Sequence, residues 1–234
     1  MKNSFDEYAS LYDAWFIQNP NVLLSEARLV ARTLKDSEKI LSVGCGSGLF
    51  EKILRENFNI DIKDGIEPAE GMAKIALQRG VNVEITTAEE GNFGQGKYDT
   101  ILFNGSPSYI SDLLPVVKKA FDNLPAGGKL ILIDVPKESG YGMMYNLAKA
   151  VGSWDNPLLE GVYPPNPYPI ELVKAANWRT TAEKTEILRE AGFDNLEFWQ
   201  TLTTHPLESD KVAEEPLPGY DKGDYVAVIG YKKL

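Results

Sequence analysis

The sequence has very little of the two side chains that most often bind transition metals. Its 234 residues include one cysteine, Cys45, and one histidine, His205. A single cysteine excludes an internal disulfide. A zinc site built from cysteine and histidine needs three or four such ligands. We therefore expect neither a disulfide framework nor a metal centre.

Long apolar runs and clusters of basic residues are also missing. No stretch approaches the roughly 18 apolar residues that a membrane span requires. The opening "MKNSFDEYASLYDAWF" carries acids and aromatics where a signal peptide has a basic start and an apolar centre. Lys and Arg number 24 against 34 Asp and Glu, a net charge of −10 that repels phosphate backbones. We expect a cytoplasmic protein that binds neither membranes nor nucleic acid.

What the sequence does have is a regular alternation of strand-like and helix-like segments. Strands separated by helices predict a parallel sheet covered on both faces, and thus an α/β fold. The predicted strands are 39–43, 62–67, 83–86, 100–104, 129–135, 196–203 and 225–231. The predicted helices are 22–34, 49–57, 69–78, 110–123, 143–151 and 181–191.

The end of the chain departs from this alternation. No helical segment separates the last two predicted strands, so we interpret them as an antiparallel pair that closes the sheet. Residues 152–178 are rich in Pro, Asn and aromatics, and residues 204–222 form a long loop. Loops of this length in a compact domain are usually functional or disordered. We interpret both as insertions within one domain.

Three glycines follow the first predicted strand, in "VGCGSG". Gly44, Gly46 and Gly48 lie where ligands bind an open parallel sheet, beyond the carboxyl ends of its strands. Glycine permits positive φ and close backbone approach, and the next helix directs free N–H groups there. The site suits a carboxylate or phosphate group. Glycine turns also serve only to connect elements. Leu49 breaks the dinucleotide spacing G-x-G-x-x-G, and no Lys-Ser/Thr follows as in a P-loop.

An acid, Glu67, ends the second predicted strand about 20 residues after the glycines. A carboxylate there can accept hydrogen bonds from both ribose hydroxyls of a nucleoside. The alternative is a charge that stabilises the helix starting at Ala69. The segment "TAEE" after the third strand adds Glu89, which could accept from an adenine amino group or lie on the surface.

Taken in order, five segments resemble the motifs of class I S-adenosylmethionine-dependent methyltransferases: "ILSVGCGSG", "GIEPAEGM", "TAEE", "YDTILFNGS" and "LPAGGKLILID". The opening "FDEYASLYDAWF" is similar to the small-molecule branch related to ubiquinone/menaquinone-biosynthesis methyltransferases. The resemblance implies a Rossmann-like three-layer sandwich with a seven-stranded, mostly parallel sheet and an antiparallel last strand. We expect one domain over residues 1–234, with an N-terminal helical lid (about 1–35) and an insertion (about 138–178).

The resemblance also implies S-adenosyl-L-methionine as cofactor and S-adenosyl-L-homocysteine as product. The family commonly has an acid two residues before the first glycine, where this chain has Ser42. Cys45 is better interpreted as a small residue between glycines than as a nucleophile, because only one histidine could act as its base. The residues implied to bind the cofactor are Gly44, Cys45, Gly46, Gly48, Glu67, Pro68, Met72, Ala88, Glu89, Asn104, Gly105 and Ser106.

A sulfonium methyl is already electrophilic, so the enzyme mainly aligns the reactants and excludes water. Aromatic faces near the sulfonium favour its charge. On a helix, Tyr8, Tyr12 and Trp15 share one face, which covers the cofactor or anchors the helix to the core. Tyr12 and His205 are the candidate catalytic residues, although His205 could equally be an ordinary loop histidine.

The loops after strands four, five and six open beside the cofactor, so their aromatic residues are the candidate acceptor pocket. These are Tyr109, Tyr141, Trp154, Tyr163, Tyr168 and Trp178, together with His205. The leading hypothesis is direct in-line methyl transfer to a small-molecule acceptor by a monomer or homodimer. A non-catalytic module of the same fold that binds the cofactor or a partner is the alternative. A nicotinamide-dependent oxidoreductase is disfavoured by the glycine spacing. "NGSPSY" differs from the N-P-P-Y type of motif of enzymes that methylate base amino groups.

Overall fold

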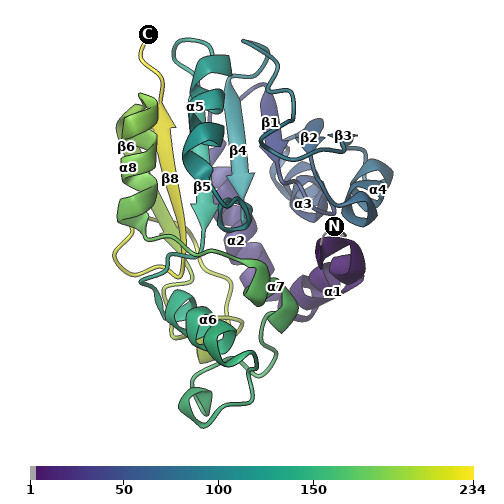
Figure 1. Cartoon of the computed structure of the whole chain (residues 1–234), viewed down its shortest axis with the longest axis vertical. Coiled ribbons are helices and arrows are strands. Elements are labelled where there is room, and N and C mark those ends of the chain that lie inside the picture. Colours follow the sequence, from purple (N-terminus) through teal and green to yellow (C-terminus); the bar gives the residue numbers. More distant parts are fainter. Residues whose placement is uncertain (1–3) are drawn as a thin grey trace.

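The structure is a computed structural model that describes residues 4–234, with side chains described from residue 11 onward. Within these residues, eight strands form one sheet in the order β3-β2-β1-β4-β5-β8-β6-β7 (Figure 1). The strands are β1 (Ile40–Val43), β2 (Asp64–Ile66), β3 (Asn82–Glu84), β4 (Thr100–Asn104), β5 (Lys129–Asp134), β6 (Asp194–Thr201), β7 (Leu217–Pro218) and β8 (Tyr225–Tyr231).

The first five strands are parallel, and β8 runs antiparallel to both of its neighbours, β5 and β6. The predicted α/β fold and the antiparallel closing pair are therefore confirmed. The sheet has one strand more than the seven expected. The extra strand is the two-residue β7, which pairs Pro218 and Leu217 with Trp199 and Gln200 at the sheet edge. Its proline lies where an edge strand tolerates a missing N–H.

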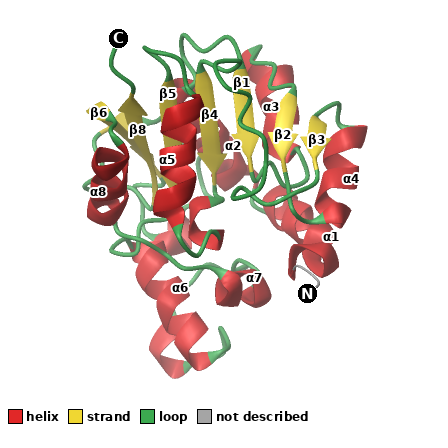
Figure 2. Cartoon of the chain, turned by 45° about the horizontal axis from the view of Figure 1, so that its top comes forward, coloured by secondary structure: helices red, strands yellow, loops and turns green. Residues whose placement is uncertain are grey.

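Helices cover both faces of this sheet (Figure 2). Side chains of a strand alternate between faces: Leu102 of β4 packs in the cluster that includes α2 and α3, whereas Phe103 packs in the cluster that includes α5 and α8. The helices are α1 (Ser4–Gln18), α2 (Pro20–Thr33), α3 (Leu49–Phe58), α4 (Glu70–Gln78), α5 (Leu113–Asn123), α6 (Gly140–Val151), α7 (Ile170–Ala175) and α8 (Thr181–Ala191), with short 3₁₀ turns at Pro107–Tyr109, Pro157–Leu159 and Pro206–Glu208.

The ends of α8 show how local sequence sets an element. The hydroxyl of Thr180 accepts from the N–H of Glu183 at 3.0 Å, and the Glu183 carboxylate accepts from the N–H of Thr180 at 2.6 Å. This capping box satisfies two of the helix's unpaired donors. At the other end Gly192 adopts φ +105°, the left-handed conformation that ends many helices.

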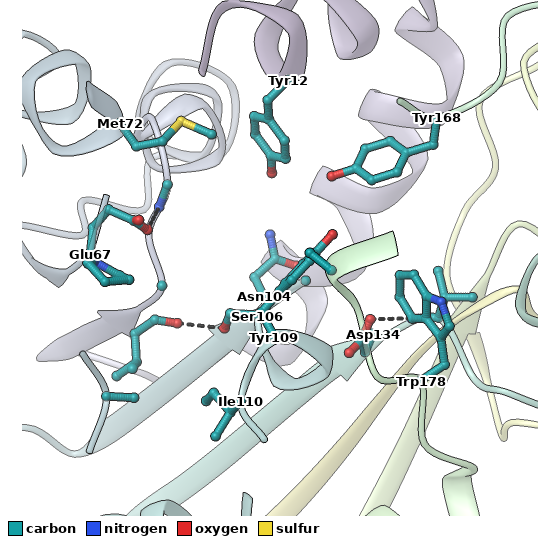
Figure 3. Close-up of a pocket in the computed structure, with 18 of the residues that line it drawn as sticks. Tyr12, Glu67, Met72, Asn104, Ser106, Tyr109, Ile110, Asp134, Tyr168 and Trp178 are labelled. Carbon is teal, nitrogen blue, oxygen red and sulfur yellow. Dashed lines mark hydrogen bonds between the residues drawn. The ribbon is translucent and has the colours of Figure 1, made fainter. Parts of the chain in front are cut away.

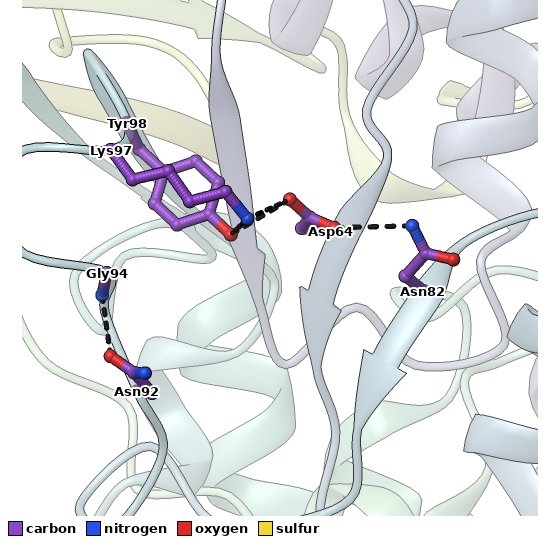
Figure 4. Close-up of polar contacts among 6 residues, drawn as sticks. All are labelled: Asp64, Asn82, Asn92, Gly94, Lys97 and Tyr98. Carbon is purple, nitrogen blue, oxygen red and sulfur yellow. Dashed lines mark hydrogen bonds and ion pairs between the residues drawn. The ribbon is translucent and has the colours of Figure 1, made fainter.

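The amino ends of β2 and β3 are joined by a polar cluster centred on Asp64 (Figure 4). Its carboxylate accepts from Lys97 Nζ at 2.7 Å, the Tyr98 hydroxyl at 2.9 Å and Asn82 Nδ2 at 3.3 Å. A shallow hollow lies beside this cluster. Because these groups satisfy one another at the edge opposite the glycine turn, we assign the cluster a role in holding the strands together.

Candidate functional site

A cavity of roughly 360 Å³ lies at the carboxyl ends of the parallel strands (Figure 3). It extends from a region lined by residues after β1, β2 and β3, here named the β2 side, to a region lined by residues of β5, α2, α6 and β8, named the β5 side. The β2 side contains Gly44, Gly46, Glu67, Pro68, Met72, Thr87, Ala88 and Glu89; the β5 side contains Glu26, Tyr109, Asp134, Tyr145, Tyr168, Trp178 and Tyr225; Asn104, Gly105 and Ser106 lie between them.

The glycine turn needs glycine for two separate reasons. Gly44 has φ +72°, and a Cβ there would lie 2.5 Å from the Cβ of Ser106, which itself donates to the Val43 carbonyl at 2.7 Å. Gly46 has φ +57°, and a Cβ there would meet nothing within 4 Å. Gly46 lines the cavity. The backbone at Gly46 is therefore open to a ligand, while Gly44 allows the turn to pack against the end of β4.

Glu67 connects the glycine turn to the start of α4. Its side chain is buried, and its carboxylate accepts from the N–H of Gly46 and from the N–H of Ala69, each at 2.9 Å. The carboxylate thus fixes the turn, and it also lines the cavity. A carboxylate has about four acceptor positions, so one side chain can serve backbone and ligand together. This position fits both predictions for Glu67, which were that it stabilises the start of the next helix or that it contacts a ligand.

Two of the predicted cofactor residues do not line the cavity. The sulfur of Cys45 packs with Ala76 and Val81, 2.7 Å from where a Cβ on Gly65 would lie. Gly48 approaches α4, since a Cβ there would lie 3.1 Å from the Cα of Ala76. Burial raises the pKa of the Cys45 thiol well above its ordinary value, and the nearby Glu51 and Glu67 add to the shift. Cys45 is thus a packing residue.

Ser42, which stands in place of the family's acid, is paired with an acid from elsewhere. Its hydroxyl donates to Oε1 of Glu51 at 2.7 Å, and both side chains are buried. Burial raises the pKa of Glu51, although the Ser42 hydroxyl opposes that shift. Glu51 lies under the turn in α3 and is not among the residues lining the cavity.

The remaining β2-side residues form the walls expected for a nucleoside. Met72 of α4 is buried and packs with Ala69, the residue before this helix, and Tyr12 and Ile75 pack against this pair. Pro68, Ala88 and Glu89 line the same side as predicted, together with Thr87, which sequence reasoning missed. Apolar walls, an open backbone at the glycine turn and a carboxylate fit the base, amino-acid tail and ribose of the expected cofactor.

The N-terminal helix closes one side of the cavity. Tyr12 and Trp15 line it, as does Phe16, whereas the side chain of Tyr8 lies outside the described residues. Burial raises the pKa of Tyr12 well above 10.0, so its phenol stays protonated at neutral pH. A protonated phenol can donate a hydrogen bond to a ligand and is not a base.

The helix α1 is attached to the glycine turn by an ion pair. Arg79 Nη2 lies 2.5 Å from Oδ2 of Asp13, and Nη1 of Arg79 donates to the carbonyl and the hydroxyl of Ser47 at 2.9 and 2.8 Å. The Ser47 hydroxyl in turn donates to Oδ1 of Asp13. These contacts hold the aromatic face of α1 over the cavity.

Three of the seven predicted acceptor-pocket residues, Tyr109, Tyr168 and Trp178, line the β5 side. The other four lie elsewhere. The Tyr141 hydroxyl bonds to Ser209 at 2.6 Å, and Trp154 donates to the Tyr168 carbonyl at 2.8 Å. Tyr163 packs on Trp154, with ring centroids 5.7 Å apart. Trp154 therefore supports Tyr168 from behind the cavity wall.

His205 is also away from the cavity. It is exposed, and its Nδ1 accepts from the N–H of Leu207 at 3.2 Å at the start of a 3₁₀ turn. The 204–222 loop is pulled onto α2, because Asp210 Oδ1 accepts from the N–H groups of Asn21 and Val22. The prediction that His205 lines the acceptor pocket is therefore corrected.

Sequence reasoning missed three polar groups on the β5 side. Glu26 lies on α2, Asp134 ends β5, and Tyr225 begins β8 and donates to Asn104 Oδ1 at 2.9 Å. The sequence contained a signal for Glu26 and Asp134. Glu26 occupies the apolar stripe that Val22, Leu29 and Val30 define, and Asp134 ends a continuous apolar strand as Glu67 ends its own. Tyr225 gave no local signal, since it reaches this edge only because β8 is antiparallel.

Among the described residues, no group of three or more His, Cys, Asp or Glu side chains could hold a metal ion. In the same part of the chain, no helix is both long and apolar enough to cross a membrane.

A Rossmann-like sheet with a glycine turn after β1 and an acid ending β2 defines a class of nucleoside-binding α/β proteins. Residues 18–197 match the family described as "Methyltransferase domain", and the chain belongs to this family. It is an S-adenosylmethionine-dependent methyltransferase, so the class I resemblance is confirmed.

Three relatives illustrate the family. A crystal structure of a Thermotoga maritima S-adenosylmethionine-dependent methyltransferase, described as a possible histamine N-methyltransferase, is 30% identical, with a TM-score of 0.82 over 98% of each chain. An uncharacterised Methanocaldococcus jannaschii protein is 31% identical over 98% of this chain and 99% of its own. Phosphoethanolamine N-methyltransferase 3 of Arabidopsis thaliana is 21% identical over 95% of this chain, which spans 44% of that protein.

Proposed function

We propose that the protein transfers a methyl group to a small-molecule acceptor by direct in-line displacement. The observation that carries this proposal is the continuity of the cavity. Its β2 side suits the cofactor, its β5 side is lined by aromatic rings, and both meet at Asn104, Gly105 and Ser106. A volume of roughly 360 Å³ lies in the range of small-ligand sites.

The role of this chain is binding and alignment. When bound, the cofactor supplies an electrophilic methyl group. Glu67 holds the ribose, and the open backbone at Gly46 receives the amino-acid tail. Asn104 is oriented by the hydroxyl of Tyr225, which donates to its side-chain oxygen at 2.9 Å. Holding two reactants in line in a site shielded from water can account for much of the rate enhancement.

Water exclusion falls to the N-terminal lid and the insertion. The ion pair of Asp13 with Arg79 fixes α1, and Trp15 donates from its indole N–H to the carbonyl of Asn166 in the insertion at 3.0 Å. Trp15 also packs edge-on against Tyr168, with ring centroids 5.0 Å apart. Two segments that lie far apart in the sequence thus close the cavity together.

Two relatives are named as enzymes or possible enzymes for histamine and phosphoethanolamine, both small molecules, which supports a small acceptor. A non-catalytic module that binds the cofactor is the alternative, and the extension of the cavity to the aromatic β5 side, beyond the region that suits the cofactor, favours catalysis over it.

To test the proposal, the protein is incubated with S-adenosylmethionine that carries a chirally labelled methyl group and with a pool of small metabolites. The methylated products and the configuration of their methyl group are then determined. We expect methylated product with inverted methyl configuration, because a single in-line displacement inverts the carbon. Retention would contradict direct transfer, and cofactor binding without turnover by the whole pool would favour the non-catalytic module.

A further inference from the structure

The β5 side of the cavity holds a carboxylate for which the described residues provide no partner. Glu26 lines the cavity from α2 with 6% of its surface exposed. No hydrogen bond or ion pair to its side chain is present among the described residues. A buried carboxyl group without a partner is costly to ionise, and proteins commonly retain one only where it has a use. The carboxylate borders space that a ligand can enter.

The surroundings of Glu26 are negative and aromatic. Asp134 lies close enough to raise the pKa of Glu26 further, after burial as the main cause. Asp134 is itself engaged, because its oxygens accept from the N–H groups of Ser108 and Val135 at 2.7 and 2.8 Å. No lysine, arginine or histidine is among the described residues that line the cavity. An anionic acceptor would therefore meet two acids and no cation.

The aromatic rings that line the β5 side together with this carboxylate suit a cation. Tyr145 lies between two of the other rings, with centroids 5.2 Å from Trp178 and 6.1 Å from Tyr168. Tyr225 adds a buried ring from β8. Faces of aromatic rings attract an ammonium within about 6 Å of the centroid, and more strongly where water is excluded.

Glu26 is distant from the part of the cavity that suits the cofactor. Asp134, its neighbour, ends β5, whereas Glu67 directly follows β2, and two strands lie between β2 and β5 in the sheet. Three strand spacings of about 4.8 Å separate the two acids by roughly 14 Å. Glu26, which lies near Asp134, can therefore bind a different ligand from the one that Glu67 binds.

We propose that the methyl acceptor is a small organic amine whose protonated nitrogen pairs with the Glu26 carboxylate among the aromatic side chains of Tyr145, Tyr168, Trp178 and Tyr225. The ammonium anchors the molecule. Because an ammonium has no lone pair, the methyl group goes to another nucleophilic atom of the same molecule. This inference rests on the proposed function and adds the chemical class of the acceptor. It assigns Glu26 to acceptor binding, a role outside the motifs that hold the cofactor.

The test uses calorimetry on the full chain saturated with S-adenosylhomocysteine. The probes are four amines of increasing size, n-butylamine, benzylamine, 2-phenylethylamine and tryptamine, with 2-phenylethanol and 3-phenylpropionate as matched neutral and anionic compounds. We expect at least one amine to bind about tenfold or more tightly than the matched compounds, because only the amine forms the desolvated charge pair. Equal binding by the alcohol or the acid, or binding by no amine, overturns the proposal.

The variant Glu26→Gln keeps the shape and removes the charge. We expect it to lose about tenfold or more in affinity for the best amine, with S-adenosylhomocysteine affinity unchanged within about twofold. Glu51→Gln is the matched control, a buried acid beyond the cavity lining, and should keep amine binding. An unchanged amine affinity in Glu26→Gln overturns the proposal.

Glu26 could instead serve the sulfonium. In that case Glu26→Gln weakens S-adenosylmethionine binding but leaves binding of S-adenosylhomocysteine, which lacks the sulfonium charge, unaffected, and this result also overturns the proposal. Failure of the wild-type protein to bind S-adenosylhomocysteine at all would count against the proposed function itself. This outcome differs from failure of the amine proposal, in which the protein binds S-adenosylhomocysteine but shows no preference for an amine.

Discussion

Glu67→Gln separates the two tasks that we assign to one carboxylate. The wild-type side chain accepts from the N–H of Gly46 and the N–H of Ala69, each at 2.9 Å. Glutamine offers one oxygen and one NH₂, so one backbone donor faces another donor and loses its partner. Hydrogen bonds to charged groups contribute roughly 1.5–3 kcal/mol each, and we therefore expect a destabilisation of about 2–3 kcal/mol.

The loss in stability converts to a measurable change in melting temperature. For a chain of this size, each kcal/mol shifts Tm by about 2–4 °C, so the variant should melt roughly 4–12 °C lower. Cofactor affinity should fall as well, because the ribose hydroxyls lose a charged acceptor. A loss of about 2 kcal/mol corresponds to a roughly 30-fold higher Kd for S-adenosylhomocysteine.

A chemical comparison distinguishes ribose binding from a general disturbance of the turn. In calorimetry, the wild type should bind the 2′,3′-dideoxy analogue more weakly than S-adenosylhomocysteine itself. Glu67→Gln should bind the two ligands with nearly the same affinity. Glu90→Gln, an exposed acid nearby that is not among the lining residues, is the control. If both proteins discriminate equally between the two ligands, Glu67 does not bind the ribose and the assignment is refuted.

Gly44→Ala should lower stability to urea by more than Gly96→Ala, because both sites have positive φ but only Gly44 would place a Cβ against another side chain. Arg79→Met removes the ion pair that holds α1, so limited chymotrypsin digestion should cut within α1 faster than in the wild type. Burial and Asp134 raise the pKa of Glu26 above 4.5. Between pH 4.5 and the raised pKa, Glu26 is protonated in the native protein but ionised in the unfolded chain. The free energy of unfolding that Glu26 contributes therefore falls as pH rises through this range. Without ligand, Glu26→Gln should therefore gain stability over the wild type across that range.

Three results would contradict these expectations. Equal urea midpoints for the two glycine variants would remove the proposed clash at the turn. Unchanged cleavage of the Arg79 variant would show that packing alone fixes α1. A stability difference between Glu26→Gln and wild type that stays constant from pH 4 to pH 8 would mean that Glu26 keeps an ordinary pKa, which scanning calorimetry across this range would reveal.

The cofactor side was largely readable from the sequence, because its determinants are local. A strand, a positive-φ turn and a helix follow one another within 40–58, and Gly44 and Gly46 lie where that order requires. Glu67 was found for the same reason, since the end of a parallel strand fixes its edge of the sheet. Cys45 was misplaced because spacing does not tell which way a turn residue points.

The residues of the β5 side were decided by the tertiary structure. Tyr225 reaches the cavity only because β8 is antiparallel, and Glu26 only because α2 packs its apolar stripe against the face of the sheet formed by β8 and β6. His205 follows the sixth strand as predicted, yet hydrogen bonds from Asn21 and Val22 to Asp210 draw its loop away. Periodicity along the chain determined the sheet, its helices and the glycine turn. Contacts between residues more than a hundred positions apart determined which side chains line the β5 side of the cavity, and no local pattern encodes those contacts.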